Sequence, residues 1–197
     1  MRIVIVLLVA CLLLGFATPS FAGSALDTVK GNVDEVLKVL KNPALKGETG
    51  KKAKQDQIRR ISQKMFDFAE LSKRTLGVNW NKFSAAQRQE FVDLYRGLLE
   101  DAYIDKITSY SDERINYTKE LQLSENAAEV QSIVVTKNAE IPVYYRMLNK
   151  DGQWRVYDVV IEGVSLVNNY RTQFREILAN NSPEYLLDTM RKKVQKK

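Results

Sequence analysis

The stretch YYRMLNKDGQWRVYDVVIEGVSLVNNYRTQFR, residues 144–175, decides the fold of this chain. Side chains alternate with period two before and after Asp151-Gly152, a dipeptide typical of tight hairpin turns. We therefore expect a hairpin of two antiparallel strands, 140–149 and 153–161. Because both faces of these strands carry apolar residues, one face is expected to pack on helices and the other to line a site.

Two more segments with the same alternation, near 113–121 and 127–137, precede the hairpin and complete a four-stranded antiparallel meander. On either side of the sheet, apolar residues recur at helical spacing. The predicted helices cover 24–41, 58–65, 67–77, 84–108, 164–178 and a last segment from 182. The fold class is therefore α+β, with a helical N-terminal half packed on a curved four-stranded sheet and closed by C-terminal helices.

Capping residues mark the starts of several predicted helices. Ser24, Asp67 and Ser84 stand at N-cap positions, and Gln87 is placed to form a capping box with Ser84. Gly97, in the middle of the longest helix, costs about 1 kcal/mol relative to alanine. We interpret this glycine as allowing a bend or a close approach.

Two lysine-rich segments have a less regular pattern. Residues 44–55 are interpreted either as a solvated linker or as the ragged start of the second helix. The basic tail, 191–197, is expected to be frayed; docking on an anionic membrane or an acidic partner is the alternative.

The N-terminus, residues 1–22, has the pattern of a cleaved signal peptide. Arg2 precedes an apolar run, and small residues stand before the expected cleavage after Ala22. The alternative is a lipoprotein signal ending at Cys11, although the apolar run continues past this cysteine. We expect a single domain over residues 23–197.

The composition argues against several kinds of chemistry. The chain has no histidine, which removes the usual general base, the commonest zinc ligand and every nucleophile activated by histidine. The single cysteine lies in the expected leader, so no disulfide is predicted. Neither a glycine-rich phosphate loop nor a nucleic-acid surface is recognisable. We therefore predict no metal, no cofactor and no nucleic-acid partner.

An enzyme remains one hypothesis. Asp158 or Glu162, near the end of the last strand, would serve as a general base if burial raised its pKa. The simpler interpretation is structural, in which these carboxylates hold the strand end to helix termini or to Arg171. No other residue pairs with them in a recognisable catalytic arrangement.

A binding protein is the second hypothesis. The sheet and the longest helix carry more large apolar residues than a one-sided core requires, and nine tyrosines offer rings with a polar tip. The same residues would also suit a completely filled core, and apolar composition alone does not separate a filled core from a cavity.

Two long blocks resemble one protein family. They are MFDFAELSKRTLGVNWNKFSAAQRQEFVDLYRGLLEDAY (65–103) and DGQWRVYDVVIEGVSLVNNYRTQF (151–174). Together with the exported N-terminus, they resemble the MlaC or toluene-tolerance family over essentially the whole mature chain. The resemblance implies a nuclear-transport-factor-like sheet and an apolar pocket for phospholipid acyl chains, with the headgroup near solvent.

The same resemblance implies a periplasmic, monomeric carrier without enzymatic activity. Its expected partners are an outer-membrane lipoprotein-porin complex and an inner-membrane ABC transporter with a ring-forming lipid-binding subunit. The expected role is the maintenance of outer-membrane lipid asymmetry. A carrier for another apolar ligand, such as a polycyclic lipid, is the alternative.

We predict the lipid-contacting residues from periodicity on one face of the sheet and on the helices that cover it. The choice of face in the last strand follows the parity of Trp154 and Val156, since a shift by one residue would invert it. The predicted residues are Tyr103, Ile107, Ile115, Tyr117, Val134, Val143, Tyr145, Met147, Val156, Val160, Leu166 and Tyr170.

Overall fold

The computed structural model describes residues 24–109 and 114–195 and confirms the α+β class. Its helices are α1 (Ala25–Lys41), α2 (Gly47–Met65), α3 (Phe68–Leu76), α4 (Ala85–Thr108), α5 (Leu166–Asn180) and α6 (Pro183–Gln195), with 3-10 turns η1 (Pro43–Leu45) and η2 (Gly77–Lys82). Its strands are β1 (Arg114–Ser124), β2 (Ala127–Val135), β3 (Glu140–Lys150), β4 (Gln153–Ile161) and β5 (Val164–Ser165).

The sheet is open, has the order β1-β2-β3-β4-β5 and is antiparallel throughout. The predicted meander of four long strands is confirmed, but the prediction of four strands in all is wrong. Val164 does not begin a helix, because it pairs with Ile161, and Ser165 pairs with Val160. Helix α5 begins only after Ser165, whose side chain accepts a hydrogen bond from the backbone N–H of Asn168.

The hairpin between β3 and β4 turns at the predicted dipeptide. Asp151 and Gly152 both have a positive φ, of 52° and 80°. A two-residue turn with positive φ at both positions has the twist that suits antiparallel strands. The hairpin prediction is therefore confirmed together with its turn.

A β-bulge in β4 changes which side chains share a face. Arg146 pairs with Asp158, whereas the next residue of β3, Met147, pairs with Val156. Tyr157 is thus an extra residue, and the side chains after it change sides. Val156 and Val160 were predicted to lie on the same face of the sheet. The bulge places them on opposite faces, so that part of the prediction is wrong.

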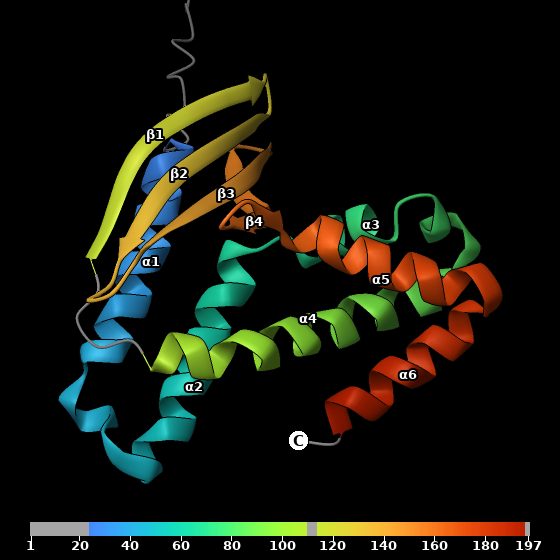
Figure 1. Ribbon diagram of the computed structural model, residues 1–197, viewed down its shortest axis with the longest axis horizontal. Helices are drawn as coiled ribbons and strands as arrows, with labels where there is room; N and C mark the ends of the chain where they lie inside the picture. Colours follow the sequence, from blue (N-terminus) through green and yellow to red (C-terminus); the bar gives the residue numbers. More distant parts are fainter. Residues whose placement is uncertain (1–23, 110–113, 196–197) are drawn as a thin grey trace, which may run out of the picture.

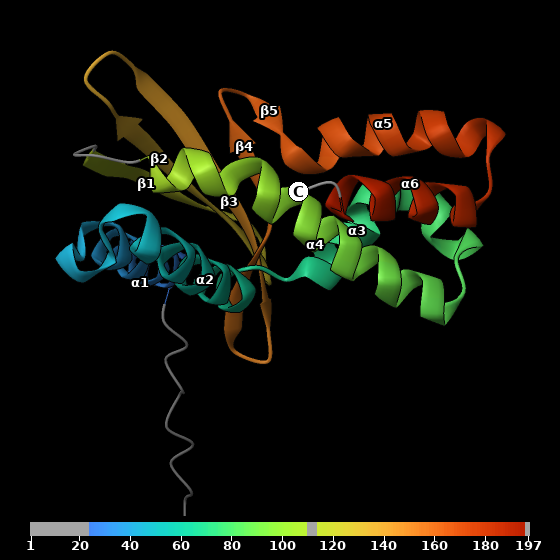
Figure 2. The same cartoon turned by 90° about the horizontal axis from the view of Figure 1, so that it is seen from below.

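The helices divide the molecule into two halves (Figures 1 and 2). In one half, α1 and α2 lie against the sheet; in the other, α5 packs against α3 and α6, and α3 and α5 meet the sheet at β4. Helix α4 runs from one half to the other. Both halves are therefore built on this one long helix.

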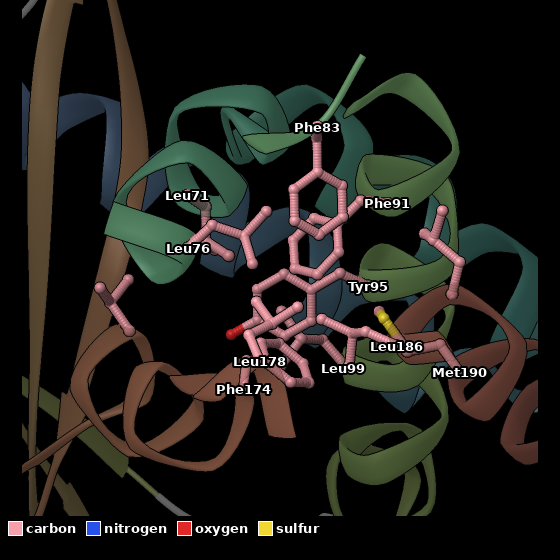
Figure 3. Packing of buried hydrophobic residues seen from close by; sticks show 12 residues of the cluster. Leu71, Leu76, Phe83, Phe91, Tyr95, Leu99, Phe174, Leu178, Leu186 and Met190 are labelled. Atoms are coloured by element: carbon pink, nitrogen blue, oxygen red, sulfur yellow. The ribbon is translucent and has the colours of Figure 1, made fainter. Parts of the chain in front are cut away.

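The all-helical half has a core of interlocking rings, shown in Figure 3. Phe91 lies at its centre, with ring centroids 5.5 Å from Tyr95, 5.4 Å from Phe174 and 5.9 Å from Phe83. Tyr170 adds a further ring, 5.1 Å from Tyr95. We call these five residues the aromatic cluster. Leucines of α3, α5 and α6 and Met190 fill the space around it.

The sheet half has its own core on the inner face of the sheet. Ala25 and Val29 of α1 pack with Val130, Met147 and Val156, and all five are fully buried. Helix α1 is further held by its first turn, because Glu120 of β1 accepts a hydrogen bond of 3.0 Å from a backbone N–H there.

The predicted helix caps are confirmed. The side chains of Ser24 and Asp67 each accept a hydrogen bond from a backbone N–H three residues later. Ser84 and Gln87 form the complete capping box that starts α4. These local signals fixed the helix starts to within one residue.

The two lysine-rich segments are more regular than the linker and frayed-tail interpretations assume. Residues 47–55 are the first turns of α2, and residues 191–195 are the last turn of α6. Arg191 forms ion pairs with Glu90 of α4 and with Glu184, which tie this end of α6 down. The predicted fraying is therefore wrong for this turn.

The expected signal peptide and the alternative at Cys11 lie outside the described residues. Within residues 24–109 and 114–195, none of the helices combines the length and the apolar character needed to cross a membrane.

Candidate functional site

A cavity of about 460 Å³ lies between α1, α2, α4 and the inner face of the sheet. Its size falls within the range of small-molecule sites, roughly 300–1,000 Å³. From the helices, its walls are formed by Val33, Val36, Leu37, Leu40, Ile58, Ile61, Met65, Leu99, Tyr103, Ile104 and Ile107. From the strands, they are formed by Ile115, Val134, Ile141, Val143, Tyr145, Val159 and Ile161.

The cavity has a buried end and an open end. At one end Met65, Leu99 and Val159 are each less than a tenth exposed. At the other end Lys106 is exposed, and Ile107 keeps 38% of its surface in water. An elongated amphipathic ligand would therefore place its apolar part inside and its polar part near Lys106.

The helical part of the wall follows from simple periodicity. In α1 the lining residues Val33, Val36, Leu37 and Leu40 have the spacing of one helix face. The N-terminal half of this face is in contact with the sheet, since Val29 is fully buried. The C-terminal half faces the cavity instead.

The strand part of the wall depends on the bulge in β4. Ile141, Val143 and Tyr145 alternate regularly along β3 and all line the cavity. In β4 the lining residues are Val159 and Ile161, which the bulge at Tyr157 turns to the inner face.

Of the twelve predicted lipid-contacting residues, seven line the cavity. They are Tyr103, Ile107, Ile115, Val134, Val143, Tyr145 and Leu166. Their contact with lipid stays a prediction.

The other five predicted residues lie elsewhere. Tyr117, Met147 and Val156 are on the inner face of the sheet but belong to its packed core. Val160 pairs with Tyr144 and Ser165 on the opposite face. Tyr170 belongs to the aromatic cluster.

The prediction missed all of the lining from α1 and α2. The apolar stripe of α1 was visible in the sequence, but a stripe does not tell whether it meets a neighbour or an empty space. A set of polar residues in the cavity wall was also missed. We call it the polar wall; it consists of Arg59 and Ser62 of α2 and Glu100 of α4. Arg59 lies three residues before Ser62, so the two side chains are neighbours on one side of α2.

The polar wall joins α2 to α4. The guanidinium of Arg59 donates to Glu100 (3.5 Å) and to Asp101 (3.0 Å), and the hydroxyl of Ser62 donates to Glu100 (3.1 Å). One turn earlier in α2, the amide of Gln55 donates to Asp105. Burial raises the pKa of Glu100, although Ser62 and Arg59 act in the opposite direction.

Tyrosines supply other polar atoms near the cavity. Burial raises the pKa of the Tyr145 hydroxyl to about 12, and it also raises the pKa of Tyr103 and Tyr117. All three stay neutral at physiological pH and therefore present uncharged rings. The hydroxyl of Tyr117 is buried without a hydrogen-bond partner.

The carboxylates of the enzyme hypothesis do not meet in this cavity. Asp158 accepts hydrogen bonds from the hydroxyl of Ser165 (2.7 Å), the backbone N–H of Val167 (3.0 Å) and Arg146 (3.3 Å). It thereby holds the start of α5 against β4, as the structural interpretation predicts. Glu162 lies exposed in the turn after β4. Within the described residues, no group of His, Cys, Asp and Glu side chains is arranged to hold a metal.

A model of the MlaC protein family matches residues 30–192. The chain belongs to the MlaC family. The family resemblance seen in the two sequence blocks is therefore confirmed.

Two curated relatives agree with this family assignment. The intermembrane phospholipid transport system binding protein MlaC of Haemophilus influenzae is 29% identical over 122 residues, which are 59% of this chain and 57% of that protein. The toluene tolerance protein ttg2D of Pseudomonas putida is 27% identical over 157 residues, which are 79% of this chain and 73% of that protein.

A solved structure shares the fold. The phospholipid-binding protein from Ralstonia solanacearum, in complex with a phospholipid, superposes with a TM-score of 0.77 at 22% identity. The match covers 88% of this chain and 98% of that one. The fold described above is therefore shared with a known protein.

Proposed function

We propose that this MlaC-family chain is a phospholipid carrier that holds acyl chains in the cavity between α1, α2, α4 and the sheet. The observation that carries the proposal is the cavity itself, whose walls are apolar along most of their length. The names of the Haemophilus and Ralstonia proteins, which refer to phospholipid transport and phospholipid binding, support the same ligand class.

The energetics require such an enclosed site. Each methylene group removed from water contributes about 0.8 kcal/mol, so two acyl chains bring on the order of 20 kcal/mol of gross transfer free energy. A lipid outside a bilayer therefore needs nearly complete cover, and its release is slow unless something opens the site. We infer that partner proteins distort the cavity when lipid is handed over.

The carrier would act between two membranes. In this proposal residues 1–22 direct export, and residues 23–197 form one lipid-binding domain in the periplasm. The partners are an outer-membrane lipoprotein-porin complex and an inner-membrane ABC transporter with a ring-forming subunit. Shuttling between them would maintain the lipid asymmetry of the outer membrane. The protein acts as a monomer and performs no covalent chemistry.

Native mass spectrometry of protein purified without detergent tests this proposal, followed by organic extraction and identification of the lipid. We expect a phospholipid bound in stoichiometric amount and chemically unchanged. A different apolar compound would contradict the ligand class, and hydrolysed or modified lipid would favour an enzyme. Protein that stays empty after incubation with phospholipid vesicles would contradict the carrier function.

A further inference from the structure

The cavity wall carries its charges in a restricted place. Among the described lining residues the charged ones are Arg59, Glu100 and Lys106, all on α2 or α4. The strands and α1 contribute uncharged residues only to the described lining. The wall formed by α2 and α4 thus holds two cations, Arg59 and Lys106, beside Glu100 and the adjacent Asp101, and among the described lining residues it is the one wall that offers cationic side chains to a negatively charged group.

Arg59 stands at the boundary between water and the apolar interior. Its side chain is 30% exposed, whereas its neighbour in sequence, Ile58, is only 4% exposed and lines the cavity. On α4, Glu100 has only 10% of its side chain exposed, close to the 7% of Leu99, so the contact of this wall with solvent comes through Arg59. A group bound to the guanidinium would therefore remain in contact with solvent while chains attached to it enter the cavity.

The present partners of Arg59 leave its binding capacity incompletely used. Its two terminal nitrogens contact two different carboxylates, Glu100 and Asp101, at 3.5 Å and 3.0 Å. A guanidinium binds most strongly when two parallel N–H groups meet two oxygens of one anion, as a phosphate provides.

We propose that Arg59 binds the phosphate of the phospholipid headgroup, which displaces Glu100, while the acyl chains lie along Ile58, Ile61 and Leu99. This inference rests on the proposed function and adds a headgroup site to it. Lys106, nearer the open end, contributes positive charge, and its ammonium lies 5.6 Å from the Tyr103 ring centroid. Since the contacts of Glu100 join α2 to α4, headgroup binding also loosens the link between these helices.

The test compares two lipids with identical chains. The full-length chain is exported, purified, stripped of lipid and equilibrated with phosphatidylcholine vesicles that contain either dioleoyl phosphatidylglycerol or dioleoylglycerol, and each bound lipid is quantified by mass spectrometry. Dioleoylglycerol has the same chains but no phosphate. The measured quantity is the ratio of phosphatidylglycerol to dioleoylglycerol bound.

Three variants separate a phosphate site from a structural ion pair. Arg59→Gln is expected to lower the ratio about tenfold, the loss typical of a hydrogen-bonded charge contact. Arg60→Gln is the matched control, because Arg60 is the next residue of α2, is exposed and does not line the cavity; it should leave the ratio unchanged. Glu100→Gln removes the competing carboxylate and should raise the ratio.

The outcomes distinguish the two proposals. If Arg59→Gln lowers the binding of both lipids equally, or changes neither, Arg59 is not a phosphate site. If Arg59→Gln does not fold, Glu100→Gln still decides, since a fall in its ratio contradicts the displacement of Glu100 by phosphate. If the unmodified protein binds neither of the two lipids and no phosphatidylcholine from the vesicles, the carrier function itself fails, and the headgroup site fails with it.

Discussion

The two halves of the molecule use similar apolar side chains, but the helical half is filled and the sheet half encloses a cavity. In the helical half, aromatic rings from α4, α5 and the loop at Phe83 meet at centroid distances between 5.1 and 5.9 Å. In the sheet half, the walls facing each other across the cavity are mostly valine, leucine and isoleucine. Rings dominate the filled half, whereas branched aliphatic side chains dominate the cavity wall, which also includes the rings of Phe66, Phe68, Tyr103 and Tyr145.

The largest expected effect comes from placing a charge in the filled part of the sheet half. Val156 is fully buried in the packed core, so Val156→Lys should prevent folding, because an unpaired buried charge costs several kcal/mol. Circular dichroism should show no cooperative thermal transition. A folded Val156→Lys protein would mean that this position opens to the cavity after all.

Removal of a ring from the aromatic cluster should have the next largest effect. Phe91→Ala leaves a hole among Phe83, Tyr95 and Phe174 and should lower the free energy of unfolding by about 3–5 kcal/mol. As a control, Ile61→Ala enlarges an existing cavity and should cost at most about 2 kcal/mol. Urea denaturation measures both. Equal losses would contradict the distinction between a filled and an open half.

The polar wall should give a smaller, pH-dependent effect. Burial raises the pKa of Glu100 in the folded state, so between the unfolded and folded pKa values the folded protein binds more protons. The contribution of Glu100 to the free energy of unfolding is complete below its pKa in the unfolded chain. This contribution is lost as pH rises through its pKa in the folded protein. Glu100→Gln removes this loss and should gain stability relative to the unmodified protein as pH rises above about 4.3, the usual pKa of an unperturbed glutamate. Urea denaturation across this range would refute the account if the difference stayed constant or changed sign.

The smallest expected effect concerns the contact between α4 and α6. A Cβ added at Gly97 would lie 3.7 Å from Val194, which is an ordinary contact, and within the described residues this glycine makes its closest approach to α6. Gly97→Ala should therefore stabilise the protein by up to about 1 kcal/mol through helix propensity and leave lipid binding unchanged. A loss of stability in thermal unfolding would show that α6 needs more room than the contact suggests.

Much of the fold was predictable because its signals are local. Asp151-Gly152 determines the hairpin, and Ser24, Asp67 and Ser84 determine helix starts through contacts made within three residues. The bulge at Tyr157 was not predictable from alternation, since an inserted residue looks like any other member of a strand. Strand β5 was missed because two residues are too short for a pattern.

The candidate site was predictable only in part. Positions on β3 such as Val143 and Tyr145 follow from period two before any bulge intervenes. The contribution of α1 depends on how far its C-terminal half lies from the sheet, which is a tertiary property. The pairing of Arg59 with Glu100 joins residues 41 positions apart, and no local pattern links them.

The central claim is that lipid occupies the inner face of the sheet at Val143. The direct test measures phospholipid per protein after detergent-free purification of Val143→Lys, Tyr144→Lys and the unmodified chain, since Tyr144 is the adjacent residue on the opposite face. With all three folded, we predict that Val143→Lys loses its lipid while Tyr144→Lys retains as much as the unmodified protein. Retention by Val143→Lys together with loss from Tyr144→Lys would place the lipid on the outer face and contradict the account.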